Sequence, residues 1–309
     1  MKRILVTGAT GFVGRHVMPF LLADEWDVHA VAYRRQLNEM SNITWHTCNL
    51  LDRVEARELF ATVGATHLLH LAWYAEPGKF WTSPENFRWV RATLELLEFF
   101  HAFGGKRIVA AGTCAEYDWN FGYCREAVTP LTPATPYGKC KDALRSLLEA
   151  YGDANGLQIA WGRIFYLYGP HEAQGRLFSS IAVSLLRGEE ARCTHGNQVR
   201  DFLHVEDVAA AFACLAASET TGSFNIGSSQ PVRIREVAEI LAREMGRPEL
   251  LRLGVMQPQP DDPPFIVADN RRLLALGWKQ RYSLLQGIAQ TAQWWIHRKD
   301  LSSKGTSEL

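Results

Sequence analysis

The sequence predicts an α/β protein, a doubly wound parallel sheet followed by a smaller mixed α/β domain at the C-terminal end. Three observations support this prediction. In the first half, short apolar β-rich runs alternate with longer helical patterns, which is typical of a parallel sheet covered on both faces. The runs at residues 2–6 and 108–111 are apolar almost throughout, as strands buried on both faces are. A glycine-rich turn follows the first run and opens the first helix.

The elements of the first half follow in a regular order. Each apolar run is short enough for a strand, and each amphipathic stretch between runs is long enough for a helix. We expect strands at residues 4–6, 28–32, 44–46, 67–71, 107–111 and 158–161, and helices at residues 13–23, 53–63, 85–103 and 136–155.

After about Arg163 the alternation loosens, and Gly/Pro punctuation separates short helices expected at residues 178–187, 205–217 and 234–245. This change predicts a second, less regular domain, with the chain crossing between the two more than once. We assign residues 1–162 and about 198–226 to the first domain, residues 163–197 and 227–300 to the second, and residues 301–309 to a disordered tail.

Composition excludes two kinds of partner. The 309 residues carry 33 basic and 33 acidic side chains, which gives a formal net charge of +0. A neutral chain has no bulk attraction for nucleic acid or for an anionic membrane surface, so any anion site must be local. The most apolar late segment, residues 208–217, is too short to span a bilayer. We therefore expect neither nucleic acid nor a membrane as a partner.

The cysteines indicate a reducing compartment. Six cysteines are scattered along the chain without a Cys-x-x-Cys pair, which predicts neither a disulfide framework nor a zinc cluster. The histidines also lack regular ligand spacing, so no metal site is expected. The basic N-terminus resembles the start of a signal peptide, but glycines and Arg15 interrupt the apolar stretch too early. We expect a cytoplasmic protein.

The glycine-rich turn predicts a dinucleotide site. Gly8 permits the tight turn, Gly11 removes a side chain that would block a pyrophosphate, and Gly14 lets the helix approach the strand. The N-terminus of the helix then offers unpaired N–H groups to the phosphates. The expected contacts in this turn are Gly8, Thr10, Gly11, Phe12, Val13 and Gly14.

The end of the second strand predicts which dinucleotide binds. An acidic residue at this place usually holds the ribose 2′-hydroxyl of NAD, whereas an arginine accommodates the 2′-phosphate of NADP. Here Tyr33 is followed by Arg34 and Arg35, with no carboxylate. Both arginines can bind a phosphate through charge-assisted hydrogen bonds, although a solvated turn is the alternative interpretation. We expect NADP, with NAD as the other possibility.

Tyr137 and Lys141 form a Tyr-x-x-x-Lys pair near an expected helix start. Four residues of separation place both side chains on one helical face. A phenol is a poor proton shuttle at neutral pH, and a nearby ammonium favours its anion. Thr113 follows the fifth strand, so it would face the same crevice as the glycine turn, where its hydroxyl can bond a substrate oxygen.

With these motifs in this order, the chain resembles the extended short-chain dehydrogenases/reductases, in the group of nucleotide-sugar epimerases, dehydratases and reductases. The resemblance implies a Rossmann domain that binds NAD(P) and a second domain that binds a nucleoside-diphosphate sugar. It implies catalytic roles for Thr113, Tyr137 and Lys141. The resemblance runs from Lys2 to about Trp295 and includes Tyr168-Gly169-Pro170, residues 200–208, Asn225-Ile226-Gly227 and Leu276-Gly277-Trp278.

The same resemblance implies further contacts. Lys141 would hold the nicotinamide ribose, and Arg200 would contact the substrate diphosphate. Tyr166 replaces an asparagine common in relatives, and Gln259 replaces a second arginine, which indicates an altered sugar-nucleotide pocket. The remaining expected contacts are Asn49, Leu50, Leu71 and Ala72 for the cofactor, and Trp73, Tyr74, Thr113, Cys114 and Arg176 for the substrate.

Departures from the family pattern narrow the reaction. Sugar 4,6-dehydratases carry an Asp-Glu pair directly after the catalytic threonine, where this chain has Cys114 and Ala115. Glu116 comes one residue later, and its side chain points elsewhere if the segment is extended. Dehydration is therefore not expected, and epimerisation or net hydride transfer remains.

The cofactor preference favours net hydride transfer. An epimerase recycles a bound NAD, whereas a biosynthetic reductase consumes NADPH, and residues 193–202 and 253–255 resemble the 4-ketoreductases that complete deoxysugars. We predict an NADPH-dependent reductase of a nucleoside-diphosphate 4-keto-6-deoxyhexose. The alternatives are a nucleotide-sugar 4-epimerase with tightly bound NAD and a non-catalytic dinucleotide-binding module. On family grounds we expect a homodimer through the helices near residues 103 and 136.

Overall fold

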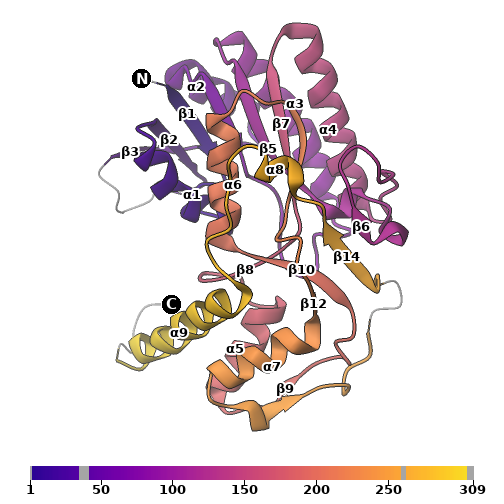
Figure 1. Ribbon diagram of the computed structural model, residues 1–309. Coiled ribbons are helices and arrows are strands. Elements are labelled where there is room, and N and C mark those ends of the chain that lie inside the picture. Colours follow the sequence, from indigo (N-terminus) through magenta and orange to yellow (C-terminus); the bar gives the residue numbers. More distant parts are fainter. Residues whose placement is uncertain (1, 35–41, 259–261, 305–309) are drawn as a thin grey trace.

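A computed structural model describes residues 2–34, 42–258 and 262–304, with side chains up to residue 298 (Figure 1). Two expected site residues, Arg35 and Gln259, lie outside the described residues. Most of the tail assigned to residues 301–309 also lies outside them, and the last helix continues to Lys304.

Seven parallel strands form the larger sheet, in the order β11-β7-β5-β4-β1-β2-β3. The prediction of a doubly wound parallel sheet is confirmed, including all six strands expected before residue 162. The strands are β1 (Arg3–Thr7), β2 (Asp27–Ala32), β3 (Ile43–Thr47), β4 (His67–His70), β5 (Arg107–Thr113), β7 (Gln158–Ile164) and β11 (Gly222–Ile226).

Helices cover both faces of this sheet (Figure 1). Along β1, Ile4 and Val6 pack in the core beneath α1 and α6, whereas Leu5 packs in the core beneath α2, α3 and α4. Successive side chains of a strand point to opposite faces, so both faces must be apolar, as the sequence is. The helices are α1 (Phe12–Ala23), α2 (Arg53–Val63), α3 (Glu85–Ala102), α4 (Pro136–Asn155) and α6 (Val205–Ala217).

A smaller mixed sheet follows, in the order β12-β10-β14-β6, with β8 also paired to β10. The chain passes between the two sheets more than once, because β10 lies in the smaller sheet while α6 and β11 after it return to the larger one. The strands are β6 (Tyr123–Cys124), β8 (Tyr166–Tyr168), β10 (Val199–His204), β12 (Pro231–Arg233) and β14 (Phe265–Ala268).

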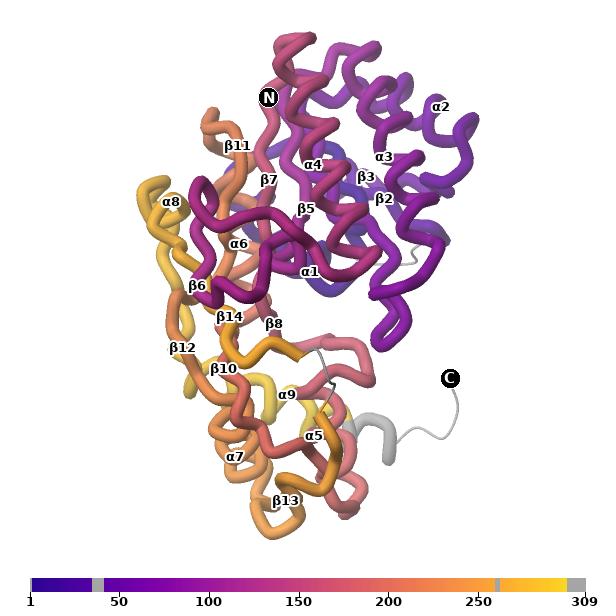
Figure 2. Tube along the Cα trace, turned by 90° about the vertical axis from the view of Figure 1, so that its right-hand side faces the viewer, coloured from indigo at the N-terminus to yellow at the C-terminus, as the bar shows by residue number. Residues whose placement is uncertain are grey.

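The C-terminal lobe is mainly helical (Figure 2). It has its own apolar core. Helices α5, α7 and α9 enclose that core beside the smaller sheet. Among the described residues, no helix is both long and apolar enough to cross a membrane. The elements here are α5 (Leu177–Arg187), α7 (Ile234–Glu244), α9 (Leu284–Lys304) and the short strands β9 (Ala191–Arg192) and β13 (Leu251–Arg252). The short helix α8 (Arg271–Leu274) lies beside β11.

The topology decides where a ligand can bind. Strand β1 lies between β2 and β4, so the connections leave in opposite directions from the neighbouring strands β1 and β4. A crevice opens at the carboxyl ends of such a strand pair, which is the usual ligand site of this architecture.

Candidate active site

A cleft of about 910 Å³ lies along the carboxyl ends of β1, β4 and β5 and continues to the start of α5. It brings together residues that are far apart in the sequence, and it is mostly apolar, as small-molecule sites are. The expected residues that line it are Gly8, Thr10, Gly11, Phe12, Val13, Gly14, Tyr33, Asn49, Leu50, Leu71, Ala72, Trp73, Thr113, Cys114, Tyr137, Lys141, Tyr166 and Arg176.

The glycine turn fits a dinucleotide. Gly11 is the N-cap of α1 and no side chain caps this helix, so its first N–H groups remain for a ligand in the cleft. A Cβ at Gly14 would lie 2.1 Å from the Gly8 carbonyl oxygen, which only glycine avoids. The helix therefore begins close against the strand, where a pyrophosphate would contact its N-terminus.

At the end of β2 the cleft is lined by Tyr33, and the exposed Arg34 follows it. Residues 31–34 contain no carboxylate. Asn49, in the loop after β3, also lines the cleft. Its backbone amide donates to the Glu55 side chain at 2.7 Å, which fixes this loop. Arg34 does not itself line the cleft.

The start of α4 is fixed by local chemistry. The Thr135 hydroxyl accepts a hydrogen bond from the Gly138 amide at 3.1 Å, and Pro136 occupies the first helical position. A Cβ on Gly138 would lie 2.2 Å from the Ala115 carbonyl oxygen, so glycine lets α4 approach the turn after β5. This close approach brings Tyr137 into the cleft that Thr113 also lines.

The Tyr137 ring is enclosed by aromatic side chains. Phe80 and Trp81 meet it edge to face, with centroids 4.9 and 5.7 Å away, and the Tyr137 amide donates to the Trp81 carbonyl oxygen. Burial raises the pKa of Tyr137 above its usual value, and the Thr113 hydrogen bond and the Arg176 charge oppose this shift. The phenol is therefore held in its protonated form at neutral pH.

Lys141 lies one helical turn further, and its ammonium is buried. Its Nζ donates to the Ala111 carbonyl oxygen at 2.9 Å and lies 3.6 Å from the centroid of the Trp73 ring. Burial lowers the pKa of Lys141 to about 7, although the Glu116 charge acts to raise it. Lys141 therefore titrates in the physiological range.

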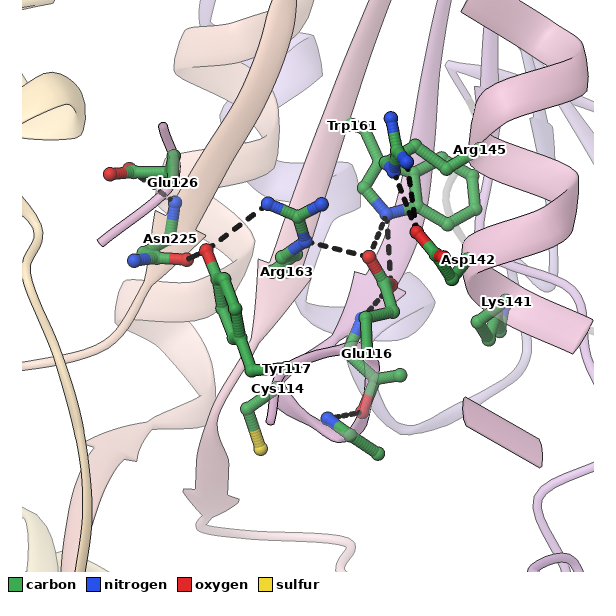
Figure 3. A network of polar contacts seen from close by, with 12 residues as sticks. Cys114, Glu116, Tyr117, Glu126, Lys141, Asp142, Arg145, Trp161, Arg163 and Asn225 are labelled. Atoms are coloured by element: carbon green, nitrogen blue, oxygen red, sulfur yellow. Dashed lines mark hydrogen bonds and ion pairs between the residues drawn. The ribbon is translucent and has the colours of Figure 1, made fainter. Parts of the chain in front are cut away.

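The turn after β5 directs Glu116 toward Trp161 and Arg163 (Figure 3). Residues Cys114–Glu116 form a 3₁₀ turn rather than an extended segment, with Thr113 as its N-cap. The Glu116 carboxylate accepts from the Thr113 amide at 2.8 Å, from Trp161 Nε1 at 2.9 Å and from Arg163 Nε at 2.6 Å. The Glu116 side chain is fully buried in this network. It points away from the positions of the dehydratase carboxyl pair, as expected, but because of the 3₁₀ turn and not because the segment is extended.

Sequence reasoning missed a carboxylate in the cleft. Glu172 follows the Tyr-Gly-Pro motif, is 4% exposed, and accepts from the Ser179 amide at 2.8 Å near Arg176. Burial raises its pKa to about 7. Its place after that motif is the one sequence signal that could have indicated it. Several aromatic lining residues were also missed, namely Phe80, Trp89, Phe165, Phe178 and Phe202.

Two expected substrate residues are engaged outside the cleft lining. The Tyr74 hydroxyl donates to Glu76 at 2.8 Å. Arg200 is buried, lies over the Tyr166 ring at 5.2 Å, and pairs with Asp262 at 2.5 Å. Asp262 is therefore the ion-pair partner of the Arg200 guanidinium, which by the family resemblance would contact the substrate diphosphate.

The fold and the cleft define an enzyme of the extended short-chain dehydrogenase/reductase type. Residues 4–227 match the model of the NAD dependent epimerase/dehydratase family. Because the match spans most of the chain, this protein belongs to that family. The family match and the sheet order thus confirm the resemblance read from the sequence.

Curated relatives carry several activities. The chain is 27% identical to UDP-glucuronate 4-epimerase 4 of Arabidopsis thaliana, over 95% of this chain and 75% of the relative. It is 22% identical to the CDP-abequose synthase of Salmonella typhimurium, over 93% of this chain and 96% of that protein. Among solved structures, it is similar to the Thermus thermophilus UDP-glucose 4-epimerase in complex with NAD, with 26% identity, a TM-score of 0.82 and coverage of 95% and 99% of the two chains.

Proposed function

We propose that the protein is an NADPH-dependent reductase of a nucleoside-diphosphate 4-keto-6-deoxyhexose. The observation that carries the proposal is the surrounding of Tyr137, a phenol kept protonated by burial in an aromatic cleft that Thr113 also lines. A reductase needs an acid at this position, because the sugar oxygen must receive a proton. An epimerase begins with oxidation, which needs the same phenol as a base.

The chain's own residues would hold the cofactor along the cleft. The N-terminus of α1 would bind the pyrophosphate, and Tyr33 would lie beside the adenosine ribose. The lack of a carboxylate in residues 31–34, together with Arg34, supports the 2′-phosphate of NADP over the free hydroxyl of NAD. NAD is the cofactor in the similar Thermus epimerase structure, so this preference is part of the proposal.

The proposed reaction has a simple balance. A bound reduced nicotinamide would supply the hydride for the ketone carbon and would itself be oxidised. Tyr137 donates its proton to the ketone oxygen and Thr113 hydrogen-bonds it, which gives the alcohol. The Lys141 ammonium stabilises the phenolate that Tyr137 becomes. A proton from solvent then restores the phenol.

Dehydration is not part of the proposal. Elimination of water needs a carboxyl pair beside the threonine, and Cys114 and Ala115 occupy those positions. Glu116 cannot replace them, because its carboxylate is fully buried and bound to Arg163 and Trp161.

The sugar nucleotide would extend from Tyr137 toward α5. Trp73, Cys114, Tyr166 and Arg176 line that part of the cleft. The aromatic rings around Tyr137 would offer apolar contacts to a C6 methyl group, which supports a deoxysugar. Arg200 would reach a diphosphate after its Asp262 partner is displaced.

A nucleotide-sugar 4-epimerase is the second candidate. It is favoured by the curated and structural relatives, several of which are described as 4-epimerases. The two candidates differ in net cofactor consumption. An epimerase returns its hydride to the substrate, whereas a reductase consumes one NAD(P)H per turnover.

The decisive experiment is cofactor consumption. The purified protein is first analysed for bound NAD, and NADPH and NADH oxidation is then followed with 4-keto-6-deoxysugars linked to UDP, CDP, GDP and dTDP. Stoichiometric NADPH oxidation with one of them supports the reductase. The same nucleotides linked to 4-hydroxy sugars are tested in parallel, because only these can form a C4 epimer. Tightly bound NAD with formation of the C4 epimer and no net oxidation overturns the reductase in favour of the epimerase, and no reaction with either kind of sugar removes both.

We place this enzyme in the cytoplasm as a homodimer. All six cysteines are free thiols, which a reducing compartment maintains. Phe87 on α3 and Leu147 on α4 are exposed large apolar side chains on the two helices proposed for the interface. Sedimentation at several protein concentrations tests the dimer, and a monomer at all of them contradicts it.

A further inference from the structure

The ammonium of Lys141 lies between two indole rings. Its Nζ is 3.6 Å from the centroid of Trp73, which follows β4, and 5.8 Å from the centroid of Trp161, which lies in β7. Both distances are within the range at which a cation is attracted to the face of an aromatic ring. Neither tryptophan belongs to the Thr113, Tyr137 and Lys141 set read from the sequence.

Each indole nitrogen donates a hydrogen bond to a buried side chain. Trp73 Nε1 donates to Asn86 Oδ1 at 2.9 Å, and Asn86 is 0% exposed. The Asn86 amide in turn donates to the Phe80 and Ser83 carbonyl oxygens at 2.7 and 2.9 Å, which fixes its orientation. On the other side, Trp161 Nε1 donates to the buried Glu116 (Figure 3).

We propose that Trp73 and Trp161 are positioning residues that hold Lys141 in place and keep its ammonium charged inside the cleft. The proposal deepens the function above, on which it rests for the role of Lys141 beside Tyr137. A buried ammonium is costly unless something replaces its hydration shell. Two fixed indole faces and one backbone carbonyl do so here.

The arrangement also limits which ligand contacts are available. An ammonium has three N–H donors, and the Ala111 carbonyl accepts from one of them. The Trp73 face covers a second side of Nζ. One donor then remains for the cleft, enough for a ribose hydroxyl or for the Tyr137 oxygen.

The titratable groups around Lys141 determine in which direction its pKa should change when Trp73 is removed. Burial lowers the pKa of Lys141 to about 7, whereas Glu116, after β5, and Cys140, on α4, act to raise it. His70, on β4, stays neutral because burial and the Lys141 charge lower its pKa to about 3. An indole face favours the charged amine, so removing Trp73 must lower the pKa of Lys141 further.

The test measures this titration in the protein without cofactor. Trace acetylation across roughly pH 5.5 to 10, read by peptide mass spectrometry, gives the midpoint for Lys141. The reactivity of the exposed Lys139 on the same helix is the internal reference. The variants are Trp73→Leu and Trp73→Phe, with Trp45→Phe on β3 as the matched control. Thermal melting confirms that each variant is folded.

We expect Trp73→Leu to lower the Lys141 midpoint by about half to one and a half pH units, and Trp73→Phe by less, because a phenyl ring binds cations more weakly than indole. Lys139 and the Trp45→Phe protein are expected to be unchanged. An unchanged Lys141 midpoint in folded Trp73→Leu overturns the proposal, as does an equal shift in Trp45→Phe.

A second readout connects the titration to catalysis. In the active enzyme the basic limb of the kcat/KM profile should move to lower pH in Trp73→Leu by the same amount, whereas a merely structural loss would lower kcat/KM without moving the limb. If no substrate is turned over, the proposed function fails while the titration of the cofactor-free protein still decides the role of Trp73.

Discussion

Arg163 Nε donates a 2.6 Å hydrogen bond to the Glu116 carboxylate, and the two side chains are 1% and 0% exposed. The pair joins β7 to the turn after β5, and the same carboxylate accepts from the Thr113 amide. A second bond, from Arg163 Nη1 to the Tyr117 hydroxyl, continues the network to Asn225 on β11. The network thus fixes the backbone that presents Thr113.

Removing this carboxylate should destabilise the protein strongly. Glu116→Ala leaves Arg163 buried without its counter-ion and Trp161 Nε1 without its acceptor, so the free energy of unfolding should fall by about 3–5 kcal/mol. Urea unfolding measures the loss. The matched control is Glu149→Ala, which removes a partly exposed ion pair with Arg145 and should cost less than about 1 kcal/mol. Equal losses in both variants would contradict a special role for the buried pair.

Tyr137→Phe should abolish most turnover without weakening cofactor binding. The variant keeps the ring that packs against Phe80 and Trp81 and removes only the proton donor, so kcat should fall by roughly 10²- to 10⁴-fold. Steady-state NADPH oxidation and NADPH fluorescence titration measure the two quantities. Tyr151→Phe, on the same helix, is the control and should retain wild-type turnover. A Tyr137→Phe enzyme with wild-type kcat would remove Tyr137 from the proposed role.

Arg34→Ala should change which dinucleotide is preferred. A charge-assisted hydrogen bond to the 2′-phosphate is lost, so the KM for NADPH should rise about tenfold or more while the KM for NADH stays the same. Arg57→Ala, on the exposed face of α2, should alter neither value. An equal rise in both constants would show that Arg34 does not distinguish the two dinucleotides.

Glu172 should make the stability depend on pH. Burial raises its pKa from the usual 4.5 to about 7, so the folded state binds the proton more tightly than the unfolded state. Its stabilising contribution is complete below pH 4.5 and is lost as the pH rises through 7, a loss of about 3 kcal/mol. Glu172→Gln mimics the protonated form and should be more stable than the wild type at about pH 8, with little difference near pH 4.5.

Urea unfolding at both pH values measures this effect. Glu58→Gln, an exposed carboxylate on α2, is the control and should change stability little at either pH. If Glu172→Gln shifts stability equally under the acidic and the alkaline condition, titration of Glu172 is not the cause.

The fold could be predicted because its signals are local. The apolar runs, their β-branched residues and the glycine turn lie within short windows of sequence, and each window carries its own period or turn chemistry. The helix from Pro136 to Asn155 carries local signals of this kind, with Thr135 as its N-cap, Pro136 in its first turn and Gly156 as its C-cap. Helical spacing alone places Tyr137 and Lys141 on one face, whereas their catalytic roles are what the family resemblance implies.

The remainder of the candidate site depends on contacts between distant segments. Nothing near Arg200 in the sequence indicates that Asp262 pairs with it, and nothing near Lys141 indicates Trp73. Glu172 enters the cleft only because the loop before α5 folds over it. Such pairings are set by packing and charge across the whole chain, which no local pattern encodes.

The architecture and the glycine turn are predicted by the sequence alone, because periodicity and turn chemistry act over a few residues. The set of Thr113, Tyr137 and Lys141 is predicted from the family resemblance. The folded chain adds that Glu116 is buried against Arg163, that Phe80 and Trp81 enclose Tyr137, and that Lys141 lies between two indoles. These features required the tertiary structure because the protonation state and orientation of a side chain depend on burial and on neighbours from other strands and helices, which meet only when the chain has folded.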